Sequence, residues 1–299
     1  KEGDLLWTPR PEFAAESNVS RFIDWLARER GVDCADYHAL WAWSVGDVAA
    51  FWEALWDYFG ITSPTPYQAV LEHPQMPGAR WFTGARVNFA EQLLRRARPG
   101  EVALHALSEL EPLRGITWDE LARQVRCLAT WLREVGVGPG DRVVSYLPNT
   151  PQAAVALLAS AALGAIWSSC SPDFGVKSVL DRFEQIQPKV MFTIDGYRYG
   201  GKDFDRRAES AEIAAHLGSL ETIVYLPYLD RAAAPMEPPR GVRLACWDDV
   251  VPAEADVPGF QFEPTPFEHP LWIVYSSGTT GLPKPIVHGH GGITLEMLK

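Results

Sequence analysis

The sequence predicts an α/β fold built on a doubly wound, mainly parallel sheet, preceded by a helical, tryptophan-rich extension. Segments of helix and strand length alternate regularly from residue 142 to residue 226. Strands that are separated by helical crossovers pair in parallel, which gives the sheet. The first ninety residues hold seven of the twelve tryptophans, and their apolar residues recur at helical spacing, which gives the extension.

The length and composition indicate an ordinary folded protein. Its 299 residues are 47% hydrophobic and 22% charged, which excludes a largely disordered chain and a disulfide-stapled miniprotein. Asp and Glu number 38 against 27 for Lys and Arg, a net charge of −11. We therefore expect no general attraction to nucleic acid or to an anionic membrane, and any phosphate must be bound locally.

The cysteines and the first residues predict a cytoplasmic protein. The four cysteines lie far apart and match no metal-binding or redox spacing, as is typical of free thiols in a reducing compartment. Residues 1–10 are charged and contain no apolar stretch, so no secretory signal is visible. Residues 153–167 are apolar but too short to span a bilayer, and we interpret them as a buried helix that leads into a strand.

Residues 1–87 are predicted to form the helical extension and a proline-rich strap. Ser44 and Asp47 resemble a capping box at the start of a helix that Gly60 ends. Aromatic and leucine side chains recur at helical spacing after this start, which favours a packing helix over a ligand site. Residues 61–80 contain four prolines and are expected to be irregular.

Residues 88–299 are predicted to form the sheet domain. Asn88 with Glu91 caps a short helix, and Thr117 with Glu120 opens a longer one. The predicted strands span residues 102–107, 142–147, 165–169, 189–194, 222–226 and 271–275. The helices of the alternating region span residues 151–163, 176–186 and 206–217. Two proline-rich stretches, 227–240 and 252–270, are expected to be surface loops.

The segment after the last predicted strand carries the clearest functional signal. Residues 275–284 read Tyr-Ser-Ser-Gly-Thr-Thr-Gly-Leu-Pro-Lys. The glycines let the backbone turn its N–H groups toward an anion, the hydroxyl groups add donors, and the lysine supplies a cation. The segment therefore predicts a polyphosphate site. Its spacing differs from the Walker A motif, so a P-loop kinase or NTPase is not favoured.

This ten-residue string resembles the phosphate loop of the adenylate-forming superfamily, which includes acyl-CoA synthetases. Residues 117–121 and 161–172 look like two weaker motifs of the same superfamily, in the expected order. The resemblance implies that the sheet is the first, incomplete part of the superfamily's large N-terminal domain. Within the superfamily the chain is most similar to the acid–CoA ligases that act on acetoacetate, through residues 51–52, 55–61, 167–175 and 287–292.

The resemblance implies a two-step ligase reaction with ATP, Mg²⁺ and CoA. A carboxylate, with acetoacetate favoured and acetate or propionate as the alternative, attacks the α-phosphorus of ATP, and CoA then takes the acyl group from the adenylate. The implied phosphate-binding residues are Ser276, Ser277, Gly278 and Gly281. The implied catalytic residues are Lys284, Thr279 and Thr280. Pro285 stands where the superfamily usually has glycine and should stiffen the end of the loop.

The resemblance also implies that the site is completed by residues after Lys299. The adenine-binding strands, the acyl pocket, a magnesium-binding acidic residue and a mobile domain with the adenylation lysine are all expected there. We therefore expect the 299 residues alone to be inactive and the C-terminal half of the same protein to be their partner. A noncatalytic nucleotide-binding fragment is the rival interpretation.

Residues 197–202 are a second candidate site. In relatives that resemble acetyl-CoA synthetase, a Gly-Gly loop at this position contacts the nucleotide end of CoA. This makes Tyr199, Gly200, Gly201 and Lys202 candidates for CoA binding, although an ordinary surface turn fits them equally well.

Two histidines and two aspartates are weaker candidates. His288 and His290 have the spacing of two ligands on a strand but no third ligand nearby, so a role in fixing the loop or lining the acyl site is favoured over a metal site. Asp173 is expected to cap the helix that follows it, and Asp181 is expected to pair with Arg182.

Overall fold

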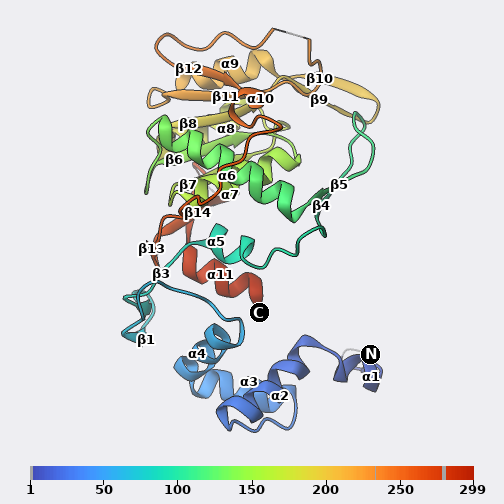
Figure 1. Cartoon of the computed structure of the whole chain (residues 1–299), viewed down its shortest axis with the longest axis vertical. Coiled ribbons are helices and arrows are strands. Elements are labelled where there is room, and N and C mark those ends of the chain that lie inside the picture. The colour runs from blue at the N-terminus through green and yellow to red at the C-terminus, as the bar shows by residue number, and fades with distance from the viewer. Residues whose placement is uncertain (1–2, 233, 278–280) are drawn as a thin grey trace. The chain divides into compact units, whose positions relative to one another are not determined.

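A twisted sheet forms the centre of the larger part of the chain (Figure 1). The computed structural model describes residues 3–232, 234–277 and 281–299, and within them seven strands form this sheet in the order β12-β11-β8-β6-β7-β14-β15. Neighbouring strands run parallel except β14 and β15, which are antiparallel. The strands are β6 (Arg142–Tyr146), β7 (Ile166–Cys170), β8 (Val190–Ile194), β11 (Thr222–Leu226), β12 (Arg243–Cys246), β14 (Pro270–Ser276) and β15 (Lys284–Gly289).

Helices cover both faces of this sheet, as the sequence predicts. Because side chains alternate along a strand, Val143 faces the cluster formed with α6 and α7, and Val144 faces the cluster formed with α8 and α9. The fold class is therefore confirmed as a doubly wound, mainly parallel α/β sheet. The helices of this region are α5 (Phe89–Leu94), α6 (Trp118–Glu134), α7 (Pro151–Ala162), α8 (Val176–Ile186), α9 (Arg207–His216), α10 (Trp247–Val250) and α11 (His290–Leu298).

The chain divides into two compact units, residues 86–294 and residues 1–85 with 295–299. The predicted domain boundary between residues 87 and 88 stays a prediction. The first unit in the chain contains α1 (Pro11–Ala15), α2 (Asn18–Arg30), α3 (Tyr37–Gly46) and α4 (Val48–Tyr58). It also contains the antiparallel pair β1 (Ala69–Glu72) and β2 (Arg80–Thr83), so the predicted proline-rich strap is partly a strand.

Three further antiparallel pairs lie among the described residues of the sheet unit. They are β3 (Arg86–Val87) with β13 (Thr265–Pro266), β4 (Val102–Ala106) with β5 (Arg114–Thr117), and β9 (Gly196–Tyr199) with β10 (Lys202–Asp205). Of these strands the sequence predicts only β4. The other five are too short and too exposed to give a clear pattern.

The predicted helix caps are partly confirmed. The side chain of Thr117 accepts a hydrogen bond from the N–H of Glu120, and that of Asn88 accepts one from Glu91. The predicted capping box at Ser44 is wrong. Asp47 is itself the N-cap residue of α4, and the hydroxyl of Ser44 donates to the carbonyl of Trp41 within α3.

Two predicted roles beside α8 are also wrong. Asp173 does not cap this helix, whose N-cap is Gly175, and instead accepts a hydrogen bond from the hydroxyl of Tyr197. Asp181 pairs with Lys177, one helical turn away, at 2.7 Å and not with Arg182.

Two observations concern the predicted compartment. All four cysteines are free thiols. Among the described residues, no helix has both the length and the apolar character that a membrane span requires.

Candidate functional site

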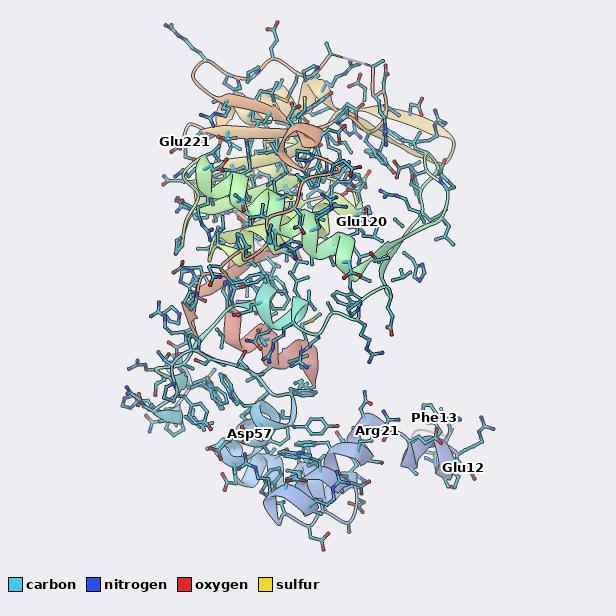
Figure 2. All side chains as sticks on the ribbon, in the orientation of Figure 1. Glu12, Phe13, Arg21, Asp57, Glu120 and Glu221 are labelled. Carbon is cyan, nitrogen blue, oxygen red and sulfur yellow. The ribbon has the colours of Figure 1, made fainter. Side chains whose placement is uncertain are left out.

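The carboxyl ends of the parallel strands bring most of the candidate residues to one edge of the sheet. The chain passes from β6 to β7 on one side and then crosses to β8 on the other, so the topological switch point lies between β6 and β8. Ligands of doubly wound sheets bind outside the strand ends at such a point. Glu221, labelled in Figure 2, precedes β11 and marks the opposite, amino edge.

A cavity of about 520 Å³ lies at this switch point. The residues that follow β6, β7 and β8 line it, together with the loop after β11. They include Asn149, Ser171, Asp173, Tyr197, Tyr199 and Tyr228. The lining is polar and aromatic, which suits a ligand that has both a ring and hydrogen-bonding groups.

The candidate phosphate residues lie on the hairpin formed by β14 and β15. Ser276 and Lys284 are opposite each other in the antiparallel register, and the segment between them joins the two strands. Ser276, Ser277, Gly281 and Lys284 are all exposed. Gly281 has a φ of +90°, a conformation that favours glycine. The predicted residues Gly278, Thr279 and Thr280 lie outside the described residues.

Helix α8 and strand β7 position this hairpin. The side-chain amide of Gln185 donates to the carbonyl of Pro283 at 3.0 Å, and the hydroxyl of Tyr275 donates to the carbonyl of Arg182 at 2.8 Å. Burial raises the pKa of Tyr275 to about 12, so its hydroxyl keeps the proton it donates. From β7, the buried hydroxyl of Ser168 donates to a carbonyl of β14 at 2.8 Å. Both arms of the hairpin are therefore attached to rigid elements.

Pro285 fits its position in the sheet. Pro285 lies on β15, the outermost strand at this side of the described sheet, and pairs with Tyr275 of β14. A proline cannot donate to a neighbouring strand and is therefore tolerated mainly on edge strands.

The turn after β7 is held by tyrosines. The hydroxyl of Tyr146 donates to the carbonyls of Pro172 and Phe174, at 3.0 Å each. The hydroxyl of Tyr197 donates to Asp173, and this bond holds the pKa of the carboxyl below its usual range. Asp173 therefore stays ionised and links the turn to β9, which closes one side of the cavity.

The second candidate site is the turn of the β9–β10 hairpin. Gly200 and Gly201 form it with φ values of +60° and +72°, and Tyr199 and Lys202 are the strand residues on either side. Consecutive positive φ values define a tight hairpin turn that favours glycine. The N–H groups of Gly200 and Gly201 donate to the two carboxylate oxygens of Glu109, at 2.6 and 2.7 Å. The turn is therefore an anion-binding nest that holds a carboxylate.

Sequence reasoning missed two acidic residues of this edge, Glu109 and Asp195. Asp195 directly follows β8, is buried, and accepts hydrogen bonds from the N–H groups of residues 228, 229 and 230 at 2.7–2.9 Å. It thereby fixes the loop after β11. The signal for Asp195 is an acidic residue at the end of a mainly apolar strand, whereas an exposed glutamate in a loop carries no such signal.

The two candidate histidines lie in different environments, one on an edge strand and the other buried at the start of α11. His288 lies on the edge strand β15, and the buried ring of His290 accepts a hydrogen bond at Nδ1 from the N–H of Phe89, at 3.1 Å. Burial, with the neighbouring His269 ring, lowers the pKa of His290 to about 3. Among the described residues, no group of three or more His, Cys, Asp or Glu is placed to hold a metal ion.

Comparison with known families decides the class of the protein. Residues 90–299 match the family model described as AMP-binding enzyme. The chain belongs to the AMP-binding enzyme family. Residues 37–93 match the model described as acetyl-coenzyme A synthetase N-terminus. The predicted resemblance to adenylate-forming enzymes is thereby confirmed.

Individual proteins of this family are similar to the chain over nearly its whole length. The acetoacetyl-coenzyme A synthetase of Rhizobium meliloti (strain 1021) is 43% identical over 98% of this chain and 44% of its own. The acetoacetyl-CoA synthetase of Danio rerio is 40% identical over 100% of this chain and 45% of its own.

A solved structure is similar as well. The acetoacetyl-CoA synthetase from Streptomyces lividans superposes with a TM-score of 0.92 and 48% sequence identity, over 98% of this chain and 44% of its own. The chain thus spans less than half of the length of these relatives.

Proposed function

We propose that the whole protein joins acetoacetate to CoA in an ATP-dependent, AMP-forming reaction. The observation that carries this proposal is the similarity to acetoacetyl-CoA synthetases over 98–100% of the chain, with a TM-score of 0.92 for the solved relative. In the first step a carboxylate oxygen bonds to the α-phosphorus of ATP and pyrophosphate leaves. In the second step the CoA sulfur bonds to the acyl carbon and AMP leaves.

The β14–β15 hairpin is the proposed pyrophosphate site. Negative charge grows on the leaving pyrophosphate, so donors and cations placed before the reaction stabilise the transition state. Ser276, Ser277 and the backbone around Gly281 are exposed at the sheet edge and would donate to the phosphates, with Thr279 and Thr280 as further proposed donors. Lys284 would supply the positive charge. Mg²⁺ would arrive with the ATP phosphates as part of the substrate.

The β9–β10 turn is the proposed site for the nucleotide end of CoA. Tyr199 is 74% exposed, and its ring is free to stack on an adenine. Lys202 lies on the opposite strand, and no ion pair within the described part of the chain holds its ammonium group, which would pair with a phosphate. The N–H groups of Gly200 and Gly201 would complete this anion site.

The exchange of labelled pyrophosphate into ATP tests the first step in the full-length protein. We expect exchange that depends on acetoacetate, AMP as the product when CoA is added, and a higher kcat/KM for acetoacetate than for acetate. ADP as the product, or no exchange with any short acid, would refute the proposed reaction. A higher kcat/KM for acetate would refute the proposed acid and leave the ligase reaction standing.

A matched assay of the 299 residues alone addresses the rival interpretation. The proposal assigns the adenine wall, the acyl pocket and the adenylation lysine to the remainder of the protein, so a phosphate site alone would not orient the attacking carboxylate. We expect these residues to be inactive by themselves. Acetoacetate-dependent exchange by the 299 residues would contradict the assignment of these parts to the rest of the protein. Inactivity of the full-length protein would favour a noncatalytic nucleotide-binding protein.

A further inference from the structure

The carboxylate of Glu109 occupies the turn that is proposed to bind a phosphate of CoA. Glu109 lies in the exposed connection between β4 and β5, residues 107–113, and Figure 1 shows this connection rising beside the β9–β10 hairpin. Each carboxylate oxygen accepts one N–H of the Gly200–Gly201 turn, at 2.6 and 2.7 Å. An arriving phosphate would meet donors that are already used and a negative charge within hydrogen-bonding distance.

The turn does not depend on Glu109 for its shape. The hairpin has a continuous antiparallel register from Gly196 and Asp205 up to Tyr199 and Lys202. Arg198 and Asp203 also form an ion pair across the two strands, with contacts of 2.5 and 3.0 Å. The two glycines adopt their positive φ values at no steric cost. The bonds to Glu109 are therefore exchangeable, because the hairpin keeps its donors in place without them.

The connection that carries Glu109 has anchors of its own. The hydroxyl of Tyr228 donates to Ser108 at 2.6 Å, and Arg231 donates to Glu111 at 3.0 Å. Because these bonds hold the residues on either side, Glu109 can release the turn by a change of its own side chain. Its exposure keeps the cost of release small, since water solvates the freed carboxylate.

We propose that Glu109 is an intramolecular competitor for the anion-binding turn, and that it sets the affinity for CoA by having to leave before the nucleotide phosphate binds. The proposal rests on the proposed function of the hairpin. When a competitor closes the turn in most molecules, the apparent Kd for CoA equals the intrinsic Kd divided by the small fraction of molecules in which the turn is open. Removing Glu109 should therefore tighten CoA binding, whereas removing a residue that merely shapes the site would weaken it.

Steady-state kinetics of the full-length enzyme test the sign of this effect. We expect Glu109→Ala to lower the KM for CoA roughly three- to ten-fold, the range that loss of an exposed charged contact allows. Glu254→Ala is the control, because this exposed glutamate removes the same charge from the sheet unit at a position outside the connection and the turn. We expect it to change the KM for CoA by less than about two-fold, within the small effects of surface substitutions.

Dephospho-CoA, which lacks the 3′-phosphate, identifies the group that competes. The gain from Glu109→Ala should appear with CoA and be absent with dephospho-CoA. A KM for CoA that is unchanged or raised in Glu109→Ala, or an equal gain with both compounds, would overturn the proposal. Pyrophosphate exchange without CoA, measured on every protein, separates the two hypotheses. If the wild-type protein shows no exchange, the proposed function is refuted. If the wild type shows exchange but Glu109→Ala leaves the KM for CoA unchanged, only the competitor proposal is refuted.

Discussion

Acid should destabilise this protein through the single side chain of His290. The ring is buried at the start of α11, and its Nδ1 accepts the N–H of Phe89. Among the described residues, its Nε2 has no hydrogen-bond partner. A charged imidazolium would therefore lose its solvation without gaining a partner, which is why burial lowers its pKa from 6.5 to about 3.

The sign and size of the effect follow from proton linkage. Between pH 6.5 and about 3 the unfolded chain binds a proton at this residue that the folded chain does not, so falling pH favours unfolding. The stabilisation is fully present above pH 6.5. A shift of one pKa unit corresponds to about 1.4 kcal/mol, so lowering the pH from 7.5 to 5.5 should remove about 1.4 kcal/mol through His290.

Urea unfolding of the full-length protein at these two pH values measures this loss. His290→Asn keeps an acceptor for the N–H of Phe89 and removes the titrating group, so it should lose about 1.4 kcal/mol less than the wild type over the same interval. His105→Asn, at an exposed histidine, should follow the wild type. Equal pH dependence in the wild type and in His290→Asn would refute the argument that burial keeps this ring neutral.

Three further substitutions test the other parts of the site. Lys284→Ala should raise the activation free energy of pyrophosphate exchange by about 2–4 kcal/mol, whereas Lys177→Ala, at an exposed position of α8, should not. Unchanged exchange in Lys284→Ala would show that its assigned role is wrong. Asp195→Ala leaves three N–H groups of the loop after β11 without their charged acceptor, so the free energy of unfolding in urea should fall by about 2–4 kcal/mol. In Gly196→Ala the new Cβ would lie 2.3 Å from a backbone oxygen of β10, so the KM for CoA should rise, while Gly218→Ala, with open space around it, should leave the KM unchanged.

Much of the fold could be predicted because its signals are local. A helix cap joins residues three apart, which is why the spacing of Thr117 and Glu120 suffices to place the start of α6. The central strands are buried on both faces and therefore mainly apolar, as in β8 and β11. The sequence does not predict strand β15, which is an exposed edge strand. Its sequence, Lys-Pro-Ile-Val-His-Gly, shows neither polar–apolar alternation nor a long apolar run.

The candidate site could be predicted only where its residues adjoin in sequence. The phosphate hairpin is such a case, since its residues form one continuous string. The contacts that organise the second site join distant residues. Glu109 lies 91 and 92 positions from the glycines it contacts, and Tyr197 lies 24 positions from Asp173. No spacing rule links such pairs, so only the path of the chain through the sheet brings them together.

Both proposed anion sites include backbone N–H groups of glycines, which suits the acidic balance of the chain. With a net charge of −11, the protein has no general attraction for polyphosphates. Backbone N–H groups are hydrogen-bond donors that need no charged side chain, so they can bind an anion locally in an acidic protein. Gly281 and the Gly200–Gly201 turn have positive φ values, which favour glycine, and each proposed site has one lysine nearby in sequence, Lys284 or Lys202. The N–H groups of such a turn donate to any carboxylate within reach, so an acidic protein can also supply a competitor for the phosphate. In the second site this competitor is Glu109.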